Sequence, residues 1–264
     1  MTKTVRNWVV SAMVILLAVI GGYYSLSDAN NIADHEHSSS PEHSEEEHQH
    51  QYTDSESTLE VELTYTDDTI TISMLNQDGN IPELAVTHEK LMHLIIISND
   101  LETFIHLHPE QTEEGTFVIE PSLEHTDYQA FIDIKPVNDV YVTEPITLNQ
   151  DHHSHQHRSL HPTSNKVSEV DGMTVELTHE KVEAGQSVSL SFDLKNASPE
   201  PYLGALGHVV IVDEHLATFI HVHPESEDDT IFEAHFDEAG MYKLWAEFKV
   251  DGEVRIFPFV LEVE

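Results

Sequence analysis

The chain has 264 residues, with 11 Lys or Arg against 49 Asp or Glu, so its formal net charge is −38 at pH 7. Such acidity makes nucleic acid and anionic membrane surfaces poor partners. Cysteine is absent, which excludes disulfides, thiolate metal sites and a cysteine nucleophile. This length allows one large domain or two domains of about 100 residues each.

Residues 1–27 have the pattern of an export signal. Lys3 and Arg6 precede an apolar run from Trp8 to Tyr24, which is near the lower limit for a membrane-spanning helix. The positive-inside tendency places the basic end in the cytoplasm and the acidic body outside. We therefore expect a single-pass protein of the cell membrane with most of the chain extracytoplasmic, or a secreted protein if the signal is cleaved before Asp28. A buried core helix is the alternative.

Two polar tracts are rich in histidine. Residues 28–56 contain almost no apolar side chains, so they cannot repay the entropy of ordering and are predicted to form a flexible stalk. Residues 150–166 are predicted to be a linker. Short His-rich tracts bind divalent transition metals loosely, although the histidines of a solvated linker can also be incidental. The tract histidines are His35, His37, His43, His48, His50, His152, His153, His155, His157 and His161.

Residues 57–149 and 167–264 each read as seven short strands, with turn signals about every ten residues. In the second segment Val188, Leu190, Phe192 and Leu194 alternate with polar residues and share one face. Tyr242 follows a glycine turn, as in a tyrosine corner. The predicted fold class is all-β: two tandem immunoglobulin-like antiparallel β-sandwiches after an N-terminal transmembrane or signal helix.

A nearly identical stretch occurs once in each segment. Residues 93–110 read HLIIISNDLETFIHLHPE, and residues 208–225 read HVVIVDEHLATFIHVHPE. Because the strand patterns around these stretches also match, the whole domain is predicted to be duplicated.

Each copy places three histidines on one predicted hairpin. If Ser98 pairs with Thr103, His93 lies opposite His108 and on the same face as His106, with Cβ atoms roughly 5–7 Å apart. Three imidazoles suit Zn(II), Cu(II) or Ni(II). A polar sheet face without metal is the alternative. The predicted metal ligands are His93, His106, His108, His208, His221 and His223.

Two further expectations follow from placing this trio on a sheet surface. Metal affinity should fall as the pH drops through about 6.5, the ordinary imidazole pKa. Replacing the histidines should leave the sandwich folded. The adjoining Glu110 and Glu225 are candidates for a carboxylate ligand or for orienting an imidazole.

Several single residues have simpler interpretations. Met92 could tune a Cu(I) site, but packing in the core or on the surface is the expectation. His88 lies close enough in sequence to the first trio to be weighed as a fourth ligand, although the matching position of the second repeat holds leucine. His215 and His235 are expected to face solvent. Trp245 is expected to be a core aromatic of the second sandwich.

The segments GALGHVVIVDEHLATFIHVHP, FDEAGMYKLWAEF and IFPFVLEV carry a family resemblance. The chain resembles uncharacterised, exported, His-rich proteins of Bacillus-like bacteria. These are similar to the YtkA-like family of immunoglobulin-type β-sandwiches and, more distantly, to CopC-type copper-resistance proteins. The resemblance implies an extracytoplasmic sandwich and favours copper as the metal. The amino-terminal His and Met arrangement of CopC-type proteins has no counterpart here, so no ligand is transferred from them.

The function expected from sequence is extracytoplasmic binding of a transition metal, copper favoured and zinc or nickel possible, for capture, delivery or tolerance. Delivery implies a metal transporter or an acceptor metalloprotein as partner. A metal-free adhesion domain is one alternative. A hydrolase that activates water at an open three-histidine site is another. The sequence has no HExxH, Gly-rich phosphate loop or G-x-S-x-G, so we expect binding and not catalysis.

Overall fold

The computed structural model describes residues 56–113, 115–123, 127–148, 159–222, 224, 226 and 228–264. These residues belong to a compact unit that spans residues 52–264. The predicted signal segment and, apart from residue 56, the predicted stalk lie outside the described residues. Within the described part of the chain, no helix has the length and apolar character needed to cross a membrane.

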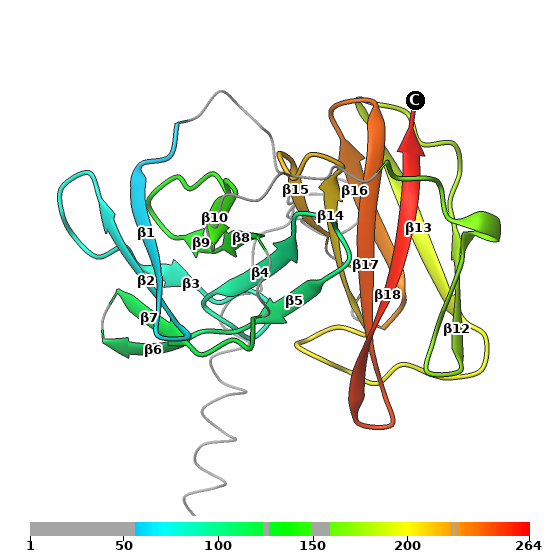
Figure 1. Cartoon of the computed structure of the whole chain (residues 1–264), viewed down its shortest axis with the longest axis horizontal. Helices are drawn as coiled ribbons and strands as arrows, with labels where there is room; N and C mark the ends of the chain where they lie inside the picture. The colour runs from blue at the N-terminus through cyan, green and yellow to red at the C-terminus, as the bar shows by residue number, and fades with distance from the viewer. Residues whose placement is uncertain are drawn as a thin grey trace, which may run out of the picture. The chain divides into compact units, whose positions relative to one another are not determined.

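The first repeat consists of two four-stranded antiparallel sheets (Figure 1). One has the order β1-β2-β7-β6, and the other has the order β10-β8-β4-β5. The short strands β3 and β9 pair with each other. The strands are β1 (Leu59–Thr66), β2 (Thr69–Asn76), β3 (Leu84–Ala85), β4 (His93–Ser98), β5 (Phe104–Leu107), β6 (Glu110–Glu113), β7 (Thr116–Ile119), β8 (Tyr128–Asp133), β9 (Lys135–Pro136) and β10 (Ile146–Leu148).

The second repeat follows the same plan, with sheets of order β11-β12-β13-β16 and β15-β14-β17-β18. A 3₁₀ turn, η2 (Ser164–Lys166), precedes it. The strands are β11 (Val167–Val170), β12 (Met173–Thr178), β13 (Gln186–Leu194), β14 (His208–Asp213), β15 (Phe219–Val222), β16 (Ile231–Phe236), β17 (Gly240–Val250) and β18 (Glu253–Val263).

The seven strands expected in each segment are all present, and they pair in the same order in both repeats. This confirms an all-β, antiparallel, duplicated fold. Sequence reasoning missed β3, β6 and β9 of the first repeat and β11 of the second. These are strands of two to four residues, too short to give a periodic pattern.

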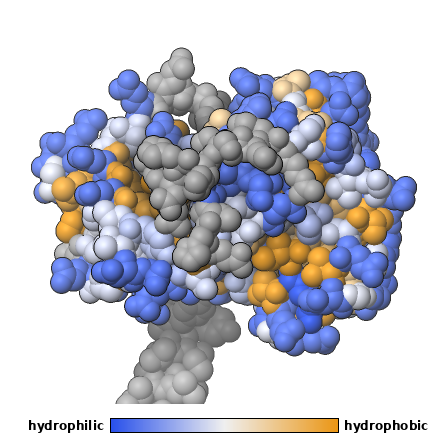
Figure 2. Space-filling model, viewed as in Figure 1, coloured by the Kyte–Doolittle hydropathy of each residue, from blue (hydrophilic) through white to orange (hydrophobic). Residues whose placement is uncertain are grey.

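Each repeat has its own hydrophobic core. In β13 the alternating residues Val188, Leu190 and Phe192 are buried, as their pattern predicted. Met92 is buried in the core of the first repeat, in agreement with a packing role. The Tyr242 hydroxyl donates a hydrogen bond to the Glu238 carbonyl at 3.0 Å, which confirms the tyrosine corner. Hydrophilic residues predominate on the face drawn in Figure 2, in keeping with the acidic composition.

A third hydrophobic cluster joins the two repeats. All six residues of β4 are buried, because Leu94 and Ile96 face the sandwich core while Ile95 and Ile97 face the other repeat. In strand β14, too, alternate residues face the core of their own repeat and the other repeat. We call this set the inter-repeat cluster: Ile95, Ile97, Leu101, Phe104, Phe131, Val210, Val212, Leu216, Phe219 and Trp245.

Contacts within the inter-repeat cluster are reciprocal. Phe104 stacks on Trp245, and Phe219, which matches Phe104 in the duplicated stretch, stacks on Phe131, both with ring centroids 4.9 Å apart. Such an exchange of equivalent contacts is typical of a two-fold interface, here formed within one chain. The expectation for Trp245 is corrected accordingly: the ring is buried, but between the repeats and not in the second sandwich core.

Candidate metal centre

The first histidine trio forms as its spacing predicted. The Ser98 amide donates to the Thr103 carbonyl at 3.0 Å, and Ile95 pairs with His106, which is the expected register. A one-residue shift would have moved His93 to the opposite face. The structure brings His93, His106 and His108 together, with one ring nitrogen from each within 4.8 Å of the others.

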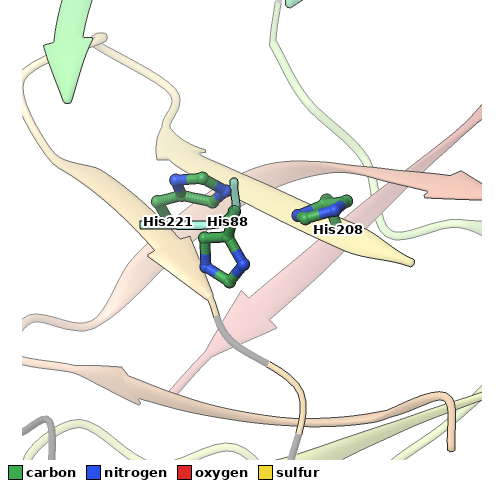
Figure 3. A group of neighbouring side chains, drawn as sticks. All are labelled: His88, His208 and His221. Atoms are coloured by element: carbon green, nitrogen blue, oxygen red, sulfur yellow. The ribbon is translucent and has the colours of Figure 1, made fainter. Parts of the chain in front are cut away.

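The second group differs from its prediction. Val210 pairs with His221, so the hairpin register is the same as in the first repeat. His208 and His221 come together, and their third partner is His88, again with ring nitrogens within 4.8 Å of one another. Figure 3 shows the His88 ring beside His221 and His208, which lie on β15 and β14. His223 lies outside the described residues, so its predicted role stays a prediction.

His88 reaches the second group from a tight turn of the first repeat. Thr87 and Lys90 exchange two backbone hydrogen bonds, and His88 and Glu89 between them have φ of 48° and 62°. Two left-handed residues define a type I′ turn, which normally contains Asn or Gly. Left-handed non-glycine residues cost about 1–3 kcal/mol each and cluster at functional sites. This turn places the His88 ring beside His208 and His221, which makes it a candidate ligand.

Main-chain carbonyls fix the tautomer of one histidine in each group. His93 Nε2 donates to the Thr87 carbonyl at 3.0 Å, and His208 Nε2 donates to the Tyr202 carbonyl at 2.9 Å. Because a carbonyl can only accept, the Nδ1 atom of each neutral ring carries the lone pair. His208 Nδ1 is buried without a hydrogen-bond partner among the described residues. Such a nitrogen is already in the form that a metal needs.

A carboxylate from the opposite repeat orients another histidine in each group. His106 Nδ1 lies 2.5 Å from Glu247 Oε2, and His221 Nδ1 lies 2.6 Å from Asp133 Oδ2. The two carboxylates occupy equivalent places, since Asp133 pairs with His93 and Glu247 pairs with His208. Carboxylates in this position hold ligating imidazoles in orientation and make them more basic.

These carboxylates replace the ones suggested by sequence. Glu110 is exposed at the start of β6, in the other sheet of the first repeat, and is not part of either group. Glu225 lies outside the described residues. No local signal identifies Asp133 or Glu247, because each acts on a histidine of the other repeat. His215 and His235 are exposed, as expected.

The groups are not on a solvent-exposed sheet face, contrary to expectation. His93 and His208 are fully buried. Burial lowers the pKa of His93 and His208 to about 4 and that of His106 and His108 to about 3, and neighbouring imidazoles add to the effect. Protonation of these rings therefore begins at a lower pH than the value near 6.5 expected from sequence. Burial also raises the pKa of Glu247 to about 7.

The shortest contact in the first group joins two nitrogens. His93 Nδ1 lies 3.1 Å from His106 Nε2. When Glu247 is ionised, His106 Nδ1 donates to it, so both facing nitrogens carry lone pairs and repel each other. Two ligands of a tetrahedral ion with bonds of about 2.05 Å would be roughly 3.3 Å apart, close to this separation. A cation coordinated by both nitrogens removes the repulsion.

Comparisons with known proteins bear on the family and the duplication. A family model described as "Domain of unknown function (DUF8832)" matches residues 48–152 and again residues 168–264. No curated protein matches the chain.

Two solved structures are similar to this chain. The two fibronectin type-III domain segment from chicken tenascin has a TM-score of 0.25 and 11% identity, and the match covers 77% of this chain and 97% of that one. The FN1-FN3 domains of chicken CNTN1 have a TM-score of 0.20 and 14% identity, over 77% of this chain and 66% of that one. Neither score carries a functional argument.

Proposed function

Because the chain belongs to the DUF8832 family, whose description assigns no function, we propose one from its own residues: the protein binds transition-metal ions between its two repeats. The observation that carries the proposal is the convergence of two groups of three imidazoles, each with ring nitrogens within 4.8 Å of one another. Hydrogen bonds on the far side of His93, His106, His208 and His221 hold those rings in place.

The donor set favours copper, with zinc and nickel as competitors. Neutral imidazole suits all three ions, and among divalent ions Cu(II) binds nitrogen sites most tightly. The resemblance to copper-resistance proteins points to the same metal. A thioether ligand from Met92 is unsuitable, because that side chain is buried in the core of the first repeat.

Burial favours holding an ion over turning over a substrate. A metal that activates water for hydrolysis needs an open coordination position beside a substrate pocket. Here His93 and His208 are fully buried, and the His106 side chain is only 1% exposed. We therefore propose binding as the function of the site.

The export signal pattern of residues 1–27 and the family resemblance support an extracytoplasmic, membrane-anchored role in metal capture, delivery or tolerance. The His-rich tracts would add weaker sites that supply ions to the buried groups. A metal transporter or an acceptor metalloprotein is the partner that delivery requires. The formal charge of −38 further favours the approach of cations.

Metal analysis of one variant tests the proposal. The background is the full-length protein with the ten tract histidines replaced by glutamine, called the tract-substituted protein, purified without metal-affinity chromatography. His108→Gln removes a ligand whose Nε2 atom has no hydrogen-bond partner among the described residues, so the fold should be little affected. We expect the affinity of one site for Cu(II) to fall more than about 100-fold, since loss of an outer partner alone costs 10–100-fold.

His235→Gln is the matched control, because His235 is exposed on β16 beside Asp237, and it should bind metal like the tract-substituted protein. If the tract-substituted protein takes up no Cu(II), Zn(II) or Ni(II) at micromolar concentration, the proposal is wrong. Unchanged affinity in His108→Gln would place the metal on other residues.

A further inference from the structure

The two histidine groups adjoin each other with no residue layer between them. The ring centroids of His93 and His221, which belong to different groups, are 5.3 Å apart. His93 and His106, within one group, are separated by the same 5.3 Å. His88 lies 5.9 Å from His93 of the other group and 5.0 Å from His208 of its own. The ring-centroid distances between the groups thus overlap with those within them.

The reciprocal architecture accounts for this closeness. His93 and Asp133 are neighbours on adjacent strands of the first repeat, and His208 and Glu247 occupy the same places in the second. Each carboxylate also forms a hydrogen bond with a histidine of the opposite repeat. Glu247 contacts His106, and Asp133 contacts His221. The local two-fold relation consequently brings equivalent histidines against each other at the interface.

From this geometry we propose that the two groups form a single binuclear metal centre, with one ion on His93, His106 and His108 and a second on His88, His208 and His221. The inference rests on the proposed metal binding and goes further, because it makes the two ions neighbours. With metal–nitrogen bonds of about 2 Å, the ring spacing limits the distance between the ions to roughly 12 Å.

Negative charge beside the imidazoles supports two cations in so small a volume. Two divalent ions bring four positive charges, and Asp133 and Glu247 supply two negative charges to the imidazoles that hold them. A cation without such compensation would be strongly disfavoured in a buried site. Each histidine group has one such carboxylate, so each ion is compensated by one negative charge.

The second metal position, on His88, His208 and His221, takes its ligands from both repeats. His208 and His221 come from the second repeat, while His88 comes from the turn Thr87–Lys90 of the first. The matching turn, Tyr202–Ala205, has Leu203 in place of His88, so this turn supplies no crossing ligand to the first position. Among the described residues, the two ions are therefore inequivalent, because the second alone is held directly by side chains of both repeats.

Electron paramagnetic resonance of the tract-substituted full-length protein tests the binuclear centre, with Cu(II) alone as the probe. We expect two equivalents to bind tightly. The spectrum with two equivalents should be broadened by magnetic coupling and should contain a half-field transition, whereas the earliest part of the titration should give the spectrum of isolated Cu(II). Two bound ions with the spectrum of isolated Cu(II), or a single bound ion, would overturn the binuclear centre and leave metal binding intact. No bound ion would overturn the proposed function itself.

The variant His88→Leu tests the ligand that crosses between the repeats. Leucine is suitable because Leu203 has φ of 52° at the matching turn position, so the backbone conformation is accessible to it. We expect the tight stoichiometry to fall from two ions to one and the half-field transition to disappear. His235→Gln should keep two coupled ions. If His88→Leu retains two coupled ions, His88 is not a ligand and the assignment of the second position is wrong.

Discussion

Replacing Trp245 with alanine is expected to lower the free energy of unfolding of the full-length protein by about 3–5 kcal/mol. Trp245 is 3% exposed and stacks on Phe104 across the inter-repeat cluster, with an interplanar angle of 17°. Its removal leaves a cavity between the repeats and ends the stacking contact, which is itself worth about 0.5–1.5 kcal/mol. Urea denaturation followed by circular dichroism measures the change.

Two comparisons show whether the loss arises between the repeats. Trp245→Phe should cost much less, because Phe131 makes the equivalent contact, stacked on Phe219. A double-mutant cycle of Phe104→Ala with Trp245→Ala should give a coupling energy of about 0.5–1.5 kcal/mol. Strict additivity of the two substitutions would mean that the rings do not interact and that the inter-repeat packing is not as described.

The sequence was sufficient for the longer strands and for the first histidine trio. Short apolar runs bounded by turn signals located the seven shared strands of each repeat, and the hairpin geometry identified the neighbours of His93. The prediction that Ser98 pairs with Thr103 required only the turn length, and it brought His93, His106 and His108 together correctly. Register is well determined in such hairpins because a one-residue shift reverses every side chain.

The contacts between the repeats were beyond this reasoning, since they join residues far apart in the chain. His88 was weighed only for the first trio, and Asp133 and Glu247 were not considered at all. One available signal was overlooked: the runs HLIII and HVVIV lack the polar alternation of a strand with one solvent-facing side. Continuous apolar strands are buried on both faces, which predicts a partner layer over β4 and β14.

Acid is expected to unfold the metal-free protein steeply between pH 6.5 and 4.5. The pKa values of His93 and His208 are lowered to about 4, and those of His106 and His108 to about 3, against about 6.5 in the unfolded chain. In this range the unfolded state binds more protons, so stability is full above pH 6.5 and is lost as the pH falls. Burial also lowers the pKa of His179, which acts in the same direction.

Glu247 opposes this trend. Its pKa is raised to about 7, so the stability it contributes is present below its unfolded value near 4.5 and is lost as the pH rises through about 7. With His179 left aside, the four histidines of the two groups against one carboxyl leave up to three net protons, or roughly 4 kcal/mol per pH unit. A total stability of about 5–15 kcal/mol would be exhausted within a few pH units.

Urea denaturation of the metal-free, tract-substituted protein at pH 7.0, 6.0, 5.0 and about 4.5 measures this slope. Glu247→Gln should make the dependence steeper by up to one proton, about 1.4 kcal/mol per pH unit, because it removes the opposing titration. A free energy of unfolding that stays constant from pH 6.5 to 4.5 would show that the histidines are not buried as neutral rings. The same flat profile would also remove the argument that the groups are held ready for a cation.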